Sequence, residues 1–371
     1  MRKIKILFLV PNLNIGGAER TIVNLLNGIN KKKFICKLML YRKEGELLKK
    51  LKPHINVINL SVSNSGLAIF KIIKHLNYEK PDIVFSTLRY PNAAMYISSN
   101  LCTSKPKVII RETNNFTAAG LKKNLTEIFV SWCYRNADKV ISLSKGVALD
   151  LRKRHQISKS KIKIIYNPVD TSYIKNEGKK KLNIKIPKDF MKKSKFKMIS
   201  VGSLEIQKGH DILIKSLKKL KNIDFYLFIV GKGSQKKSLE KLIVDCELTK
   251  RIFLLGELKN PYNLISKSDL FILPSRWEGF GHVIVESMVL GTPVLSSNCK
   301  SGPNEIITNN VSGKLYPTYS QTALIKGIQD IYKDNNLRKL LAKNGKIQAK
   351  KYNMSMIANE YQKEFINIYS K

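Results

Sequence analysis

The sequence predicts an α/β protein with two parallel, doubly wound sheets, one in each half of the chain. Short apolar runs alternate with segments of helical periodicity throughout. In each half a strand is followed by a glycine turn and a helix, and an aperiodic, lysine-rich stretch between residues 170 and 195 separates the halves. The 371 residues suffice for two cores, since single domains mostly hold roughly 100–200 residues.

The first half opens on a strand, a glycine turn and a helix. The run Ile4–Val10 is apolar apart from Lys5, but it is too short for a signal peptide and no small-residue cleavage site follows. Gly16 and Gly17 come next, and residues 18–29 then place apolar side chains at helical spacing. Further strands are expected at residues 34–41, 57–60, 81–86, 108–110 and 139–144, and a helix at residues 67–76. Buried strands that alternate with helices indicate a parallel sheet.

The same alternation restarts after the lysine-rich stretch. Strands are expected at residues 197–202, 225–230, 252–255, 270–274 and 293–297, with a helix at residues 212–220. The chain from Ser320 onward reads as helical, and its last amphipathic segment could pack on either domain. We therefore expect a Rossmann-like domain over residues 1–185, a second one over residues 196–355, and a C-terminal helix over residues 356–371 that could cross back to the first.

Composition excludes several classes of protein. Hydrophobic residues make up 43% and charged residues 25% of the chain, which is a globular balance. The five cysteines show neither CxxC nor His-paired metal spacing, so we expect free thiols in a reducing cytoplasm. No run approaches the ~20 apolar residues that a transmembrane helix needs.

The net charge of +40 suggests a polyanionic partner such as a membrane surface, a nucleic acid or a phosphorylated ligand. Residues 1–195 carry +28 of this charge and residues 196–371 carry +12, so the excess lies mainly in the first half. The chain is also rich in Lys, Ile and Asn, which an AT-biased genome over-uses. A functional basic patch and compositional drift both remain open explanations.

Three glycine turns are candidate ligand sites. Gly16 and Gly17 lie between a strand and its helix, where backbone N–H groups and the helix dipole favour an anion, although a purely structural turn would look the same. The full G-x-G-x-x-G spacing is absent, which disfavours a dinucleotide dehydrogenase. In the second half, Gly202 follows a strand and Lys208 stands at a helix start, where an ammonium group suits a diphosphate.

The third turn holds two glutamates eight residues apart. Glu278 precedes a Gly-Phe-Gly turn, and Glu286 falls about two turns into the next helix, so both carboxylates can face one cleft. Carboxylates accept paired hydrogen bonds from vicinal diols, which suits sugar and ribose hydroxyls. The backbone N–H groups of Phe280 and Gly281 can serve phosphate or carbonyl oxygens.

With these motifs the chain resembles the family-4-like retaining glycosyltransferases of GT-B architecture over nearly its whole length. Four features match in order: the Gly16-Gly17-Ala-Glu-Arg start, Asn167-Pro168-Val-Asp170, Gly202 to Lys208-Gly209, and Glu278-x7-Glu286. Asn260-Pro-Tyr-Asn and Ser301-Gly-Pro-Asn-Glu305 are most similar to bacterial enzymes that build lipid-linked oligosaccharides, O-antigen or capsular polysaccharide.

The resemblance implies a nucleotide-sugar donor, with UDP-sugar favoured, on the second domain and an acceptor on the first, across a cleft. Glu286 would bind the ribose and Lys208 the diphosphate. Glu278 would bind the donor sugar together with Phe280 and Gly281, and Gly16 and Gly17 would complete the phosphate pocket with Gly202 and Ser203. No cofactor is implied, and no catalytic metal, which agrees with the lack of an Asp-x-Asp motif.

The chain departs from the family pattern at two places. Ser203 stands where an arginine commonly contacts the diphosphate, and a neighbour such as Lys232 could replace it. Arg111 and Glu112 stand where many members carry a histidine, and either could serve the acceptor side. His282 has no assigned chemistry and fits a structural histidine equally well.

The family mechanism is attack on the face that the leaving group vacates. The leaving diphosphate oxygen would take the acceptor proton, Lys208 and backbone amides would stabilise the developing charge, and Glu278 would orient the sugar. The sequence offers no obvious pair for a covalent intermediate.

A lipid-linked acceptor would give the basic first half a role at an anionic membrane surface. Residues 121–134 could lay an aromatic and basic face on the interface, including Lys122 and Lys123. Alternatively Leu125, Ile128, Phe129 and Trp132 pack into the first domain. We expect a cytoplasmic protein that is peripheral on the inner face of the plasma membrane.

Rival functions remain. A nucleic-acid-binding protein would explain the charge, but no reading motif is present and two glutamates in a glycine cleft would serve no purpose there. A protein that binds anionic membranes without catalysis would explain the charge equally well. Another GT-B enzyme, such as a nucleotide-sugar epimerase or a glycogen-type phosphorylase, would share the fold, and so would a catalytically inactive partner subunit.

Overall fold

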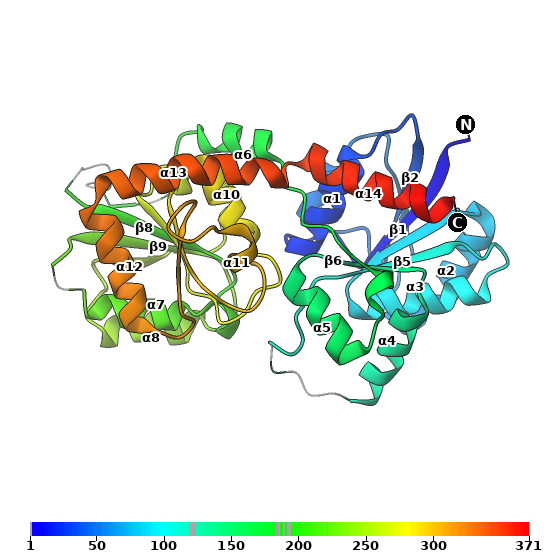
Figure 1. Cartoon of the computed structure of the whole chain (residues 1–371), viewed down its shortest axis with the longest axis horizontal. Helices are drawn as coiled ribbons and strands as arrows, with labels where there is room; N and C mark the ends of the chain where they lie inside the picture. The colour runs from blue at the N-terminus through cyan, green and yellow to red at the C-terminus, as the bar shows by residue number, and fades with distance from the viewer. Residues whose placement is uncertain are drawn as a thin grey trace. The chain divides into compact units, whose positions relative to one another are not determined.

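The computed structural model of the chain describes residues 2–118, 120, 124–182, 184, 186, 187, 190, 194–220 and 222–370. It consists of two compact units (Figure 1). One comprises the residues up to Val169 together with those from Tyr352 onward, and the other runs from Asp170 to Lys351. Of the expected joint at 170–195, residues 183, 185, 188, 189 and 191–193 lie outside the described residues.

The boundaries between the units differ from the expected 185 and 355. Helix α6 (Thr171–Gly178) follows the first crossing and packs against α9 (Tyr262–Ile265) and α10 (His282–Leu290), so it belongs to the second unit. The two crossings are paired: the Val169 N–H donates to the carbonyl of Tyr352 at 2.8 Å, and the Met354 N–H donates to that of Val169 at 2.9 Å. The second crossing, between Lys351 and Tyr352, therefore falls within η4 (Lys350–Tyr352).

The first unit is built on a seven-stranded parallel sheet with the order β3-β2-β1-β4-β5-β6-β7. Its strands are β1 (Ile4–Val10), β2 (Phe34–Leu40), β3 (Asn56–Asn59), β4 (Ile83–Thr87), β5 (Lys107–Glu112), β6 (Lys139–Ser142) and β7 (Ile162–Ile164). The six expected strands are confirmed. The seventh, β7, was not foreseen because it is a three-residue edge strand with no fully buried side chain.

Helices cover both faces of this sheet. Figure 1 shows α1 (Gly17–Gly28) and α14 (Met354–Tyr369) on one face, and the other face carries α2 (Ser65–Glu79), α3 (Arg89–Leu101), α4 (Leu125–Asn136) and α5 (Lys145–His155). Two short 3-10 turns, η1 (Glu46–Lys50) and η2 (Lys159–Lys161), complete the unit.

The C-terminal helix crosses back to the first unit, which was one of the two expected packings. The ring of Phe365 lies edge-on to Phe8 at 6.2 Å and to Phe85 at 5.9 Å, all three fully buried. Tyr361 contacts Phe85 at 5.8 Å. Burial of these aromatic rings fixes α14 to the first sheet, although the whole second unit lies between them in the sequence.

The second unit repeats the arrangement with a six-stranded parallel sheet in the order β10-β9-β8-β11-β12-β13. Its strands are β8 (Phe196–Val201), β9 (Phe225–Val230), β10 (Ile252–Leu254), β11 (Leu270–Leu273), β12 (Val294–Ser297) and β13 (Lys314–Tyr316). Both sheets thus have the nucleotide-binding order 3-2-1-4-5-6, and the predicted fold class is confirmed. Only β13, again three residues long, was missed.

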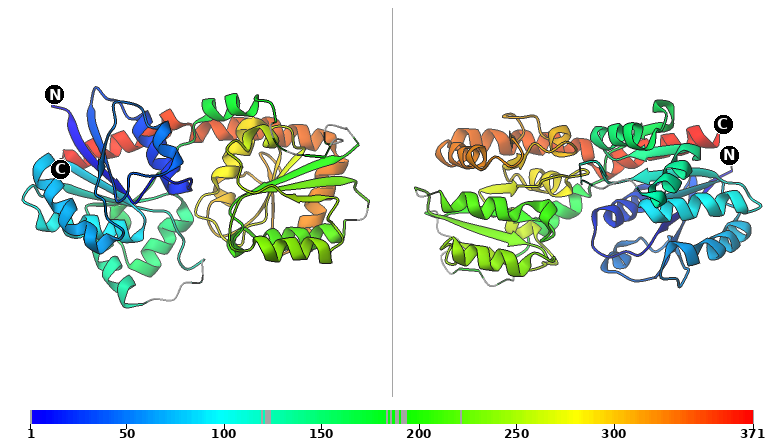
Figure 2. Two further views of the ribbon diagram at one scale, coloured as in Figure 1. Left: turned by 180° about the vertical axis from the view of Figure 1, so that it is seen from behind. Right: turned by 90° about the horizontal axis from the view of Figure 1, so that it is seen from below.

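Two helical layers sandwich the second sheet. One holds α7 (His210–Lys218), α8 (Lys236–Asp245) and α12 (Gln321–Lys333), and the other holds α6, α9, α10 and α13 (Asn335–Ala349), with the short α11 (Pro303–Ile306) against α10 (Figure 2). The 3-10 turn η3 (Ile206–Lys208) links β8 to α7. Among the described residues, no helix is long and apolar enough to cross a membrane.

Candidate functional site

The strongest site candidates gather at the carboxyl edge of the second sheet, where β8 and β11 lie side by side. The strand order reverses between these two strands, so their following loops diverge and leave room for a ligand. The loop after β8 carries Gly202 and Lys208, and the loop after β11 carries Glu278.

Glycine lets the two loops touch. Gly209 caps η3 with φ +64°, and a Cβ there would lie 2.1 Å from the carbonyl oxygen of Pro274, so only glycine fits this approach. Gly202 lies against the stem of Lys208, since its Cβ would be 3.2 Å from Lys208 Cδ. The turn around Lys208 is thereby pressed against the end of β11.

Lys208 and Glu278 form an ion pair across these loops. The Nζ of Lys208 lies 2.6 Å from Oε1 of Glu278, and the Ser275 hydroxyl donates to the same oxygen at 2.7 Å. The carboxylate is only 5% exposed, so the ammonium and hydroxyl compensate a charge that burial would otherwise penalise. A sugar or phosphate that enters here meets a cation and an acceptor already oriented by protein contacts.

The Gly-Phe-Gly turn places backbone amides next to this pair. Gly281 is the N-cap of α10 with φ +95°, and among the described residues no side chain caps the helix. Phe280 is buried, and a Cβ on Gly302 would come within 2.2 Å of its carbonyl oxygen. The start of α10 therefore presents the positive end of its dipole at the site, which favours an anion. His282 packs edge-on against the ring of Phe280 at 5.5 Å.

Glu286 lies in α10, as the spacing predicted, and is 4% exposed. The hydroxyl of Tyr262 on α9 donates to its Oε1 at 3.4 Å. The two glutamates of the motif are thus both buried acceptors, one on a loop and one on a helix. Tyr262 was not singled out as a partner, because nothing in the sequence relates residues 24 positions apart on different helices.

The expected substitute for the missing arginine has another partner. Ser203 is exposed, and Lys232 is 77% exposed with its Nζ 2.6 Å from Glu257 Oε2. Gly231 packs so closely on Gly202 that a Cβ would lie 1.9 Å from the Gly202 carbonyl oxygen. A diphosphate role for Lys232 would need its pair with Glu257 to open.

In the first unit, a carboxylate covers the Gly16 turn. Gly16 is the N-cap of α1 with extended backbone, and a Cβ there would lie 2.1 Å from Oε2 of Glu19. Burial raises the pKa of Glu19, against its own backbone N–H and the charge of Arg111, which lower it. The motif contains Glu19, but the sequence pattern alone indicates no role for it. The part of Gly16 and Gly17 in donor binding stays a prediction.

Arg111 and Glu112 are both fully buried. The Arg111 guanidinium donates to Thr87 Oγ1 at 3.1 Å, to the Tyr361 hydroxyl at 3.2 Å and to Asn167 Oδ1. It therefore fastens α14 and the first crossing to the sheet.

Glu112 has partners of its own. Its Oε1 accepts from two backbone N–H groups that follow it, and its Oε2 accepts from the Tyr134 hydroxyl at 2.7 Å. Burial raises the pKa of Glu112. Contact with an acceptor would require either residue to exchange these partners, so their acceptor role stays a prediction.

Comparison with known proteins identifies the family. The family model "Glycosyltransferase Family 4" matches residues 15–173, and "Glycosyl transferases group 1" matches residues 183–348. The chain belongs to these glycosyltransferases. The gap between the two matched ranges, residues 174–182, lies between the last strand of the first sheet and the first strand of the second.

Relatives and solved structures agree with this assignment. The glycosyltransferase is 28% identical over 362 residues to the Campylobacter jejuni N-acetylgalactosamine-N,N'-diacetylbacillosaminyl-diphospho-undecaprenol 4-alpha-N-acetylgalactosaminyltransferase, covering 95% of this chain and 96% of that one. A glycosyltransferase structure from Rickettsia africae matches with a TM-score of 0.83 at 20% identity, over 99% of both chains. Anabaena HepE in complex with UDP-glucose matches with a TM-score of 0.83 at 20% identity, over 98% of this chain and 100% of that one. The GT-B fold is confirmed.

The exposure of side chains in residues 121–134 decides between the two arrangements that the sequence left open for this segment. Residues 121–123, with Lys122 and Lys123, lie outside the described residues. On α4, four large apolar side chains face solvent with exposed fractions of 45–85%: Leu125, Ile128, Phe129 and Trp132. The alternative that they pack into the first domain is therefore wrong. Val130, Cys133 and Tyr134 make the buried face instead.

Sequence reasoning missed the pair Arg276 and Asp211. The two side chains form a bidentate ion pair at 2.8 and 2.7 Å beside the Lys208 turn. Asp211 follows Gly209 by two residues and Arg276 precedes Glu278 by two, so opposite charges beside two neighbouring motifs were the available signal.

Proposed function

We propose that this glycosyltransferase moves a sugar, with retention of configuration, from a nucleoside-diphosphate sugar to a hydroxyl of a lipid-linked oligosaccharide acceptor. UDP is the nucleotide to test first. The observation that supports the proposal most is the buried pair of Lys208 and Glu278 at the switch point of the second sheet, with Glu286 on the adjoining helix.

Each group of the site would serve one part of the donor. Glu286 would accept hydrogen bonds from the ribose hydroxyls, because a carboxylate suits a vicinal diol. Lys208 would bind the diphosphate, with the backbone around Gly202 and Ser203. The amides of Phe280 and Gly281 would hold the sugar and its phosphate at the start of α10. We propose that Gly16 and Gly17 of the first unit also take part in donor binding.

The transfer step needs no enzyme nucleophile. The bond from the anomeric carbon to the diphosphate oxygen breaks, the acceptor oxygen bonds to the same face of that carbon, and the acceptor proton moves to the leaving diphosphate. Lys208 and the amides stabilise the negative charge that develops on the diphosphate, and Glu278 orients the sugar. The products are the extended acceptor and the nucleoside diphosphate. We propose that the step is independent of metal ions.

The choice of substrates rests on relatives. The Campylobacter relative named above acts on a diphospho-undecaprenol acceptor, and a second one, 26% identical over 97% of this chain and 98% of its own length, is named as a GalNAc transferase on a diNAcBac-PP-undecaprenol chain. A protein from Escherichia coli, 30% identical over 58% of this chain and 61% of its own, is named for O-antigen biosynthesis. HepE of the same fold binds UDP and UDP-glucose.

A polyprenyl-linked acceptor requires approach to a bilayer, and we propose that α4 makes that approach. Leu125, Ile128, Phe129 and Trp132 recur at positions i, i+3, i+4 and i+7, so they form one exposed stripe. Phe129 stacks on Trp132 at 6.1 Å, and Tyr96 lies edge-on to Trp132 at 5.4 Å, which steadies the stripe. The charge of +28 on residues 1–195 favours anionic lipid.

The proposal is tested in two steps with the purified chain. Thermal unfolding with UDP, GDP, ADP and CMP should show selective stabilisation by one nucleotide, because saturation at 100 times the dissociation constant adds about 2.7 kcal/mol. A transfer assay then supplies that nucleotide's sugars, a diphosphate-linked acceptor with a short prenyl chain, and EDTA. Activity lost in Lys208→Ala and retained in the control Lys314→Ala, which removes a partly buried ion pair elsewhere in the same unit, supports the proposal. Stabilisation only by nucleic acid would contradict it.

A further inference from the structure

Arg276 joins the turn that carries Lys208 to the loop that carries Glu278. It stands two residues before Glu278, in the loop that follows β11. Its backbone N–H donates to the carbonyl of Gln207 at 2.8 Å, and its Nη1 donates to the carbonyl of Ile206 at 2.7 Å. Lys208 is the next residue of that turn.

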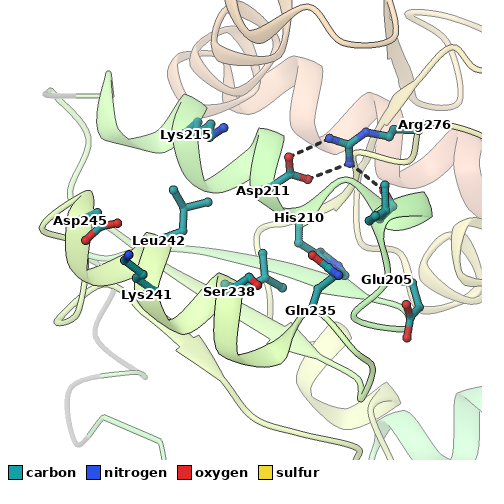
Figure 3. Close-up of a pocket in the computed structure, with 12 residues that line it drawn as sticks. Glu205, His210, Asp211, Lys215, Gln235, Ser238, Lys241, Leu242, Asp245 and Arg276 are labelled. Carbon is teal, nitrogen blue, oxygen red and sulfur yellow. Dashed lines mark hydrogen bonds and ion pairs between the residues drawn. The ribbon is translucent and has the colours of Figure 1, made fainter.

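The same side chain also holds the far side of the turn. The guanidinium of Arg276 donates to both carboxylate oxygens of Asp211, the second residue of α7, at 2.8 and 2.7 Å (Figure 3). Figure 3 shows the two side chains facing each other in the wall of the pocket between α7 and α8. Arg276 therefore fixes positions on both sides of Lys208.

Other contacts close the remaining gap between the loops. The Gln207 side chain donates to the carbonyl of Trp277 at 2.9 Å, and Gly209 lies against the carbonyl of Pro274. Gln207 and Gly209 thus contact the backbone of the loop after β11, while the side chain of Lys208 donates to the Glu278 carboxylate in the same loop. Since the planar guanidinium offers a fork of donors, a lysine at position 276 would reproduce only part of these contacts.

The Arg276–Asp211 pair stays ionised although solvent reaches part of it. Burial alone would raise the pKa of Asp211, but hydrogen bonds and the charge of Arg276 hold it below its ordinary value. The side chains are 18% and 34% exposed, so solvent reaches one side of the pair.

We propose that Arg276 is a positioning residue for donor binding and transfer. Through Ile206, Gln207 and Asp211 it sets the position of the Lys208 ammonium relative to the Glu278 carboxylate. It does not touch the reacting atoms. The inference rests on the proposed function for its effect on catalysis, but the placement of Lys208 can be measured without any substrate.

The first test reads that placement directly. The full chain is treated with a limiting amine-acylating reagent, and the labelling rate of each lysine is followed by mass spectrometry. Lys208 is 17% exposed and ion-paired, so it should react slowly in the native chain. Arg276→Gln should raise its rate at least about fivefold. Lys314, 21% exposed and paired with Asp330, serves as the matched lysine whose rate should not change.

The second test reads the consequence for function. Arg276→Gln should lower both kcat and nucleotide affinity, and Arg276→Lys should recover part of the loss. The effect on nucleotide affinity should vanish in a Lys208→Ala background, since a positioning residue has nothing left to position. Arg338→Gln is the matched control, because Arg338 also donates to two backbone carbonyls, those of Ile331 and Tyr332, but at the α12–α13 junction. It should leave kcat unchanged.

Failure of the positioning role and failure of the proposed function give different results. Unchanged labelling of Lys208 in a folded Arg276→Gln variant overturns the inference whatever the activity. Faster labelling with no nucleotide affinity in the native chain would leave the positioning role standing and contradict the proposed function. Equal losses of nucleotide affinity on Arg276→Gln with and without Lys208 would show a merely structural role and overturn the inference. If Arg276→Gln fails to fold, Asp211→Asn, which keeps the contacts to Ile206 and Gln207, should show a smaller rise in Lys208 labelling, and no rise would overturn the inference.

Discussion

The Nζ of Lys208 lies 2.6 Å from Oε1 of Glu278, although 70 residues separate them. Glu278 is nearly fully buried, and the hydroxyl of Ser275 shares the same oxygen. If a diphosphate binds as we propose, the Lys208 ammonium, which has three N–H donors, would share its charge between the phosphate and this carboxylate. The Glu278 carboxylate could then accept a hydrogen bond from a sugar hydroxyl, and the two parts of donor binding would be coupled through one contact.

Substitution of either partner should abolish turnover without unfolding the chain. We expect Lys208→Ala to weaken nucleoside-diphosphate binding by roughly 10–100-fold, since a hydrogen bond to a charged group contributes about 1.5–3 kcal/mol. Glu278→Gln should lower kcat more than it changes nucleotide affinity, which calorimetry and initial rates would separate. Full activity of Glu278→Gln would contradict the sugar-orienting role.

Glu286→Gln should weaken nucleotide binding roughly tenfold and leave kcat at saturating donor nearly unchanged, because an interaction made equally in the ground and transition states appears in KM. The control is Tyr262→Phe, which removes only the 3.4 Å hydrogen bond to Glu286 and should cost less. Binding of the nucleotide and of the corresponding deoxyribonucleotide should be compared by calorimetry. If Glu286 does not contact the ribose, the preference for the ribonucleotide will survive the substitution.

A buried charge cluster should dominate the stability of the first unit. Glu127 is 2% exposed and bound by the Arg154 guanidinium through both oxygens, with Arg89 Nη2 at 3.8 Å. Glu127→Gln leaves two buried guanidinium groups without their counterion, so we expect a loss of about 3–5 kcal/mol in the free energy of unfolding. Urea unfolding would measure it. Glu240→Gln, in an exposed pair with Lys236, should change the value by less than about 1 kcal/mol.

His210 should make the second unit less stable in mild acid. Burial, with the charge of Lys208, lowers its pKa from 6.5 to about 4. Between pH 6.5 and about pH 4, His210 is therefore protonated in the unfolded chain and neutral in the folded chain. The free energy of unfolding therefore falls as pH drops from 6.5 toward 4, by up to about 1.4 kcal/mol per pH unit.

That pH dependence can be isolated to one histidine. A Trp132→Phe background leaves Trp277 as the tryptophan that reports the second unit. Urea unfolding at pH 7.5, 6.0 and 5.0 should show a shallower slope in His210→Gln than in the parent chain. Identical slopes would mean that His210 has the same pKa in the folded and the unfolded chain.

The stripe on α4 should bind phosphatidylglycerol vesicles. Ile128→Asp with Phe129→Asp should lower the affinity at least tenfold, because burial of each large apolar side chain contributes about 1.5–3 kcal/mol. Val244→Asp, at a 61% exposed position on α8, is the control. Trp132 fluorescence in a Trp277→Phe background should shift to the blue on vesicle binding. Absence of that shift with binding retained would place the membrane contact on another surface.

Strands and site motifs could be predicted because their signals are local. A continuous apolar run such as residues 6–10 or Phe225–Val230 is expected to be buried on both faces of a sheet, and the turn that follows such a run lies at the edge of the sheet. Lys208 and Glu278 were found because each stands in a turn that follows such a run, and Glu286 was found by its place in the next helix. The three-residue edge strands β7 and β13 escaped because their pattern is too short to distinguish from a loop.

What remained depended on contacts between distant parts of the chain. The sequence cannot tell whether Arg111 points to a ligand or to Thr87, Asn167 and Tyr361, because its burial is decided by elements that fold against it. The outward stripe of α4 was equally undetermined, since an apolar helix face looks the same whether a sheet or solvent lies beside it. The sequence by itself determined two parallel sheets and their ligand edges. Only tertiary structure decided which charges at those edges are paired, because pairing requires the convergence of loops whose separation in sequence carries no information about distance.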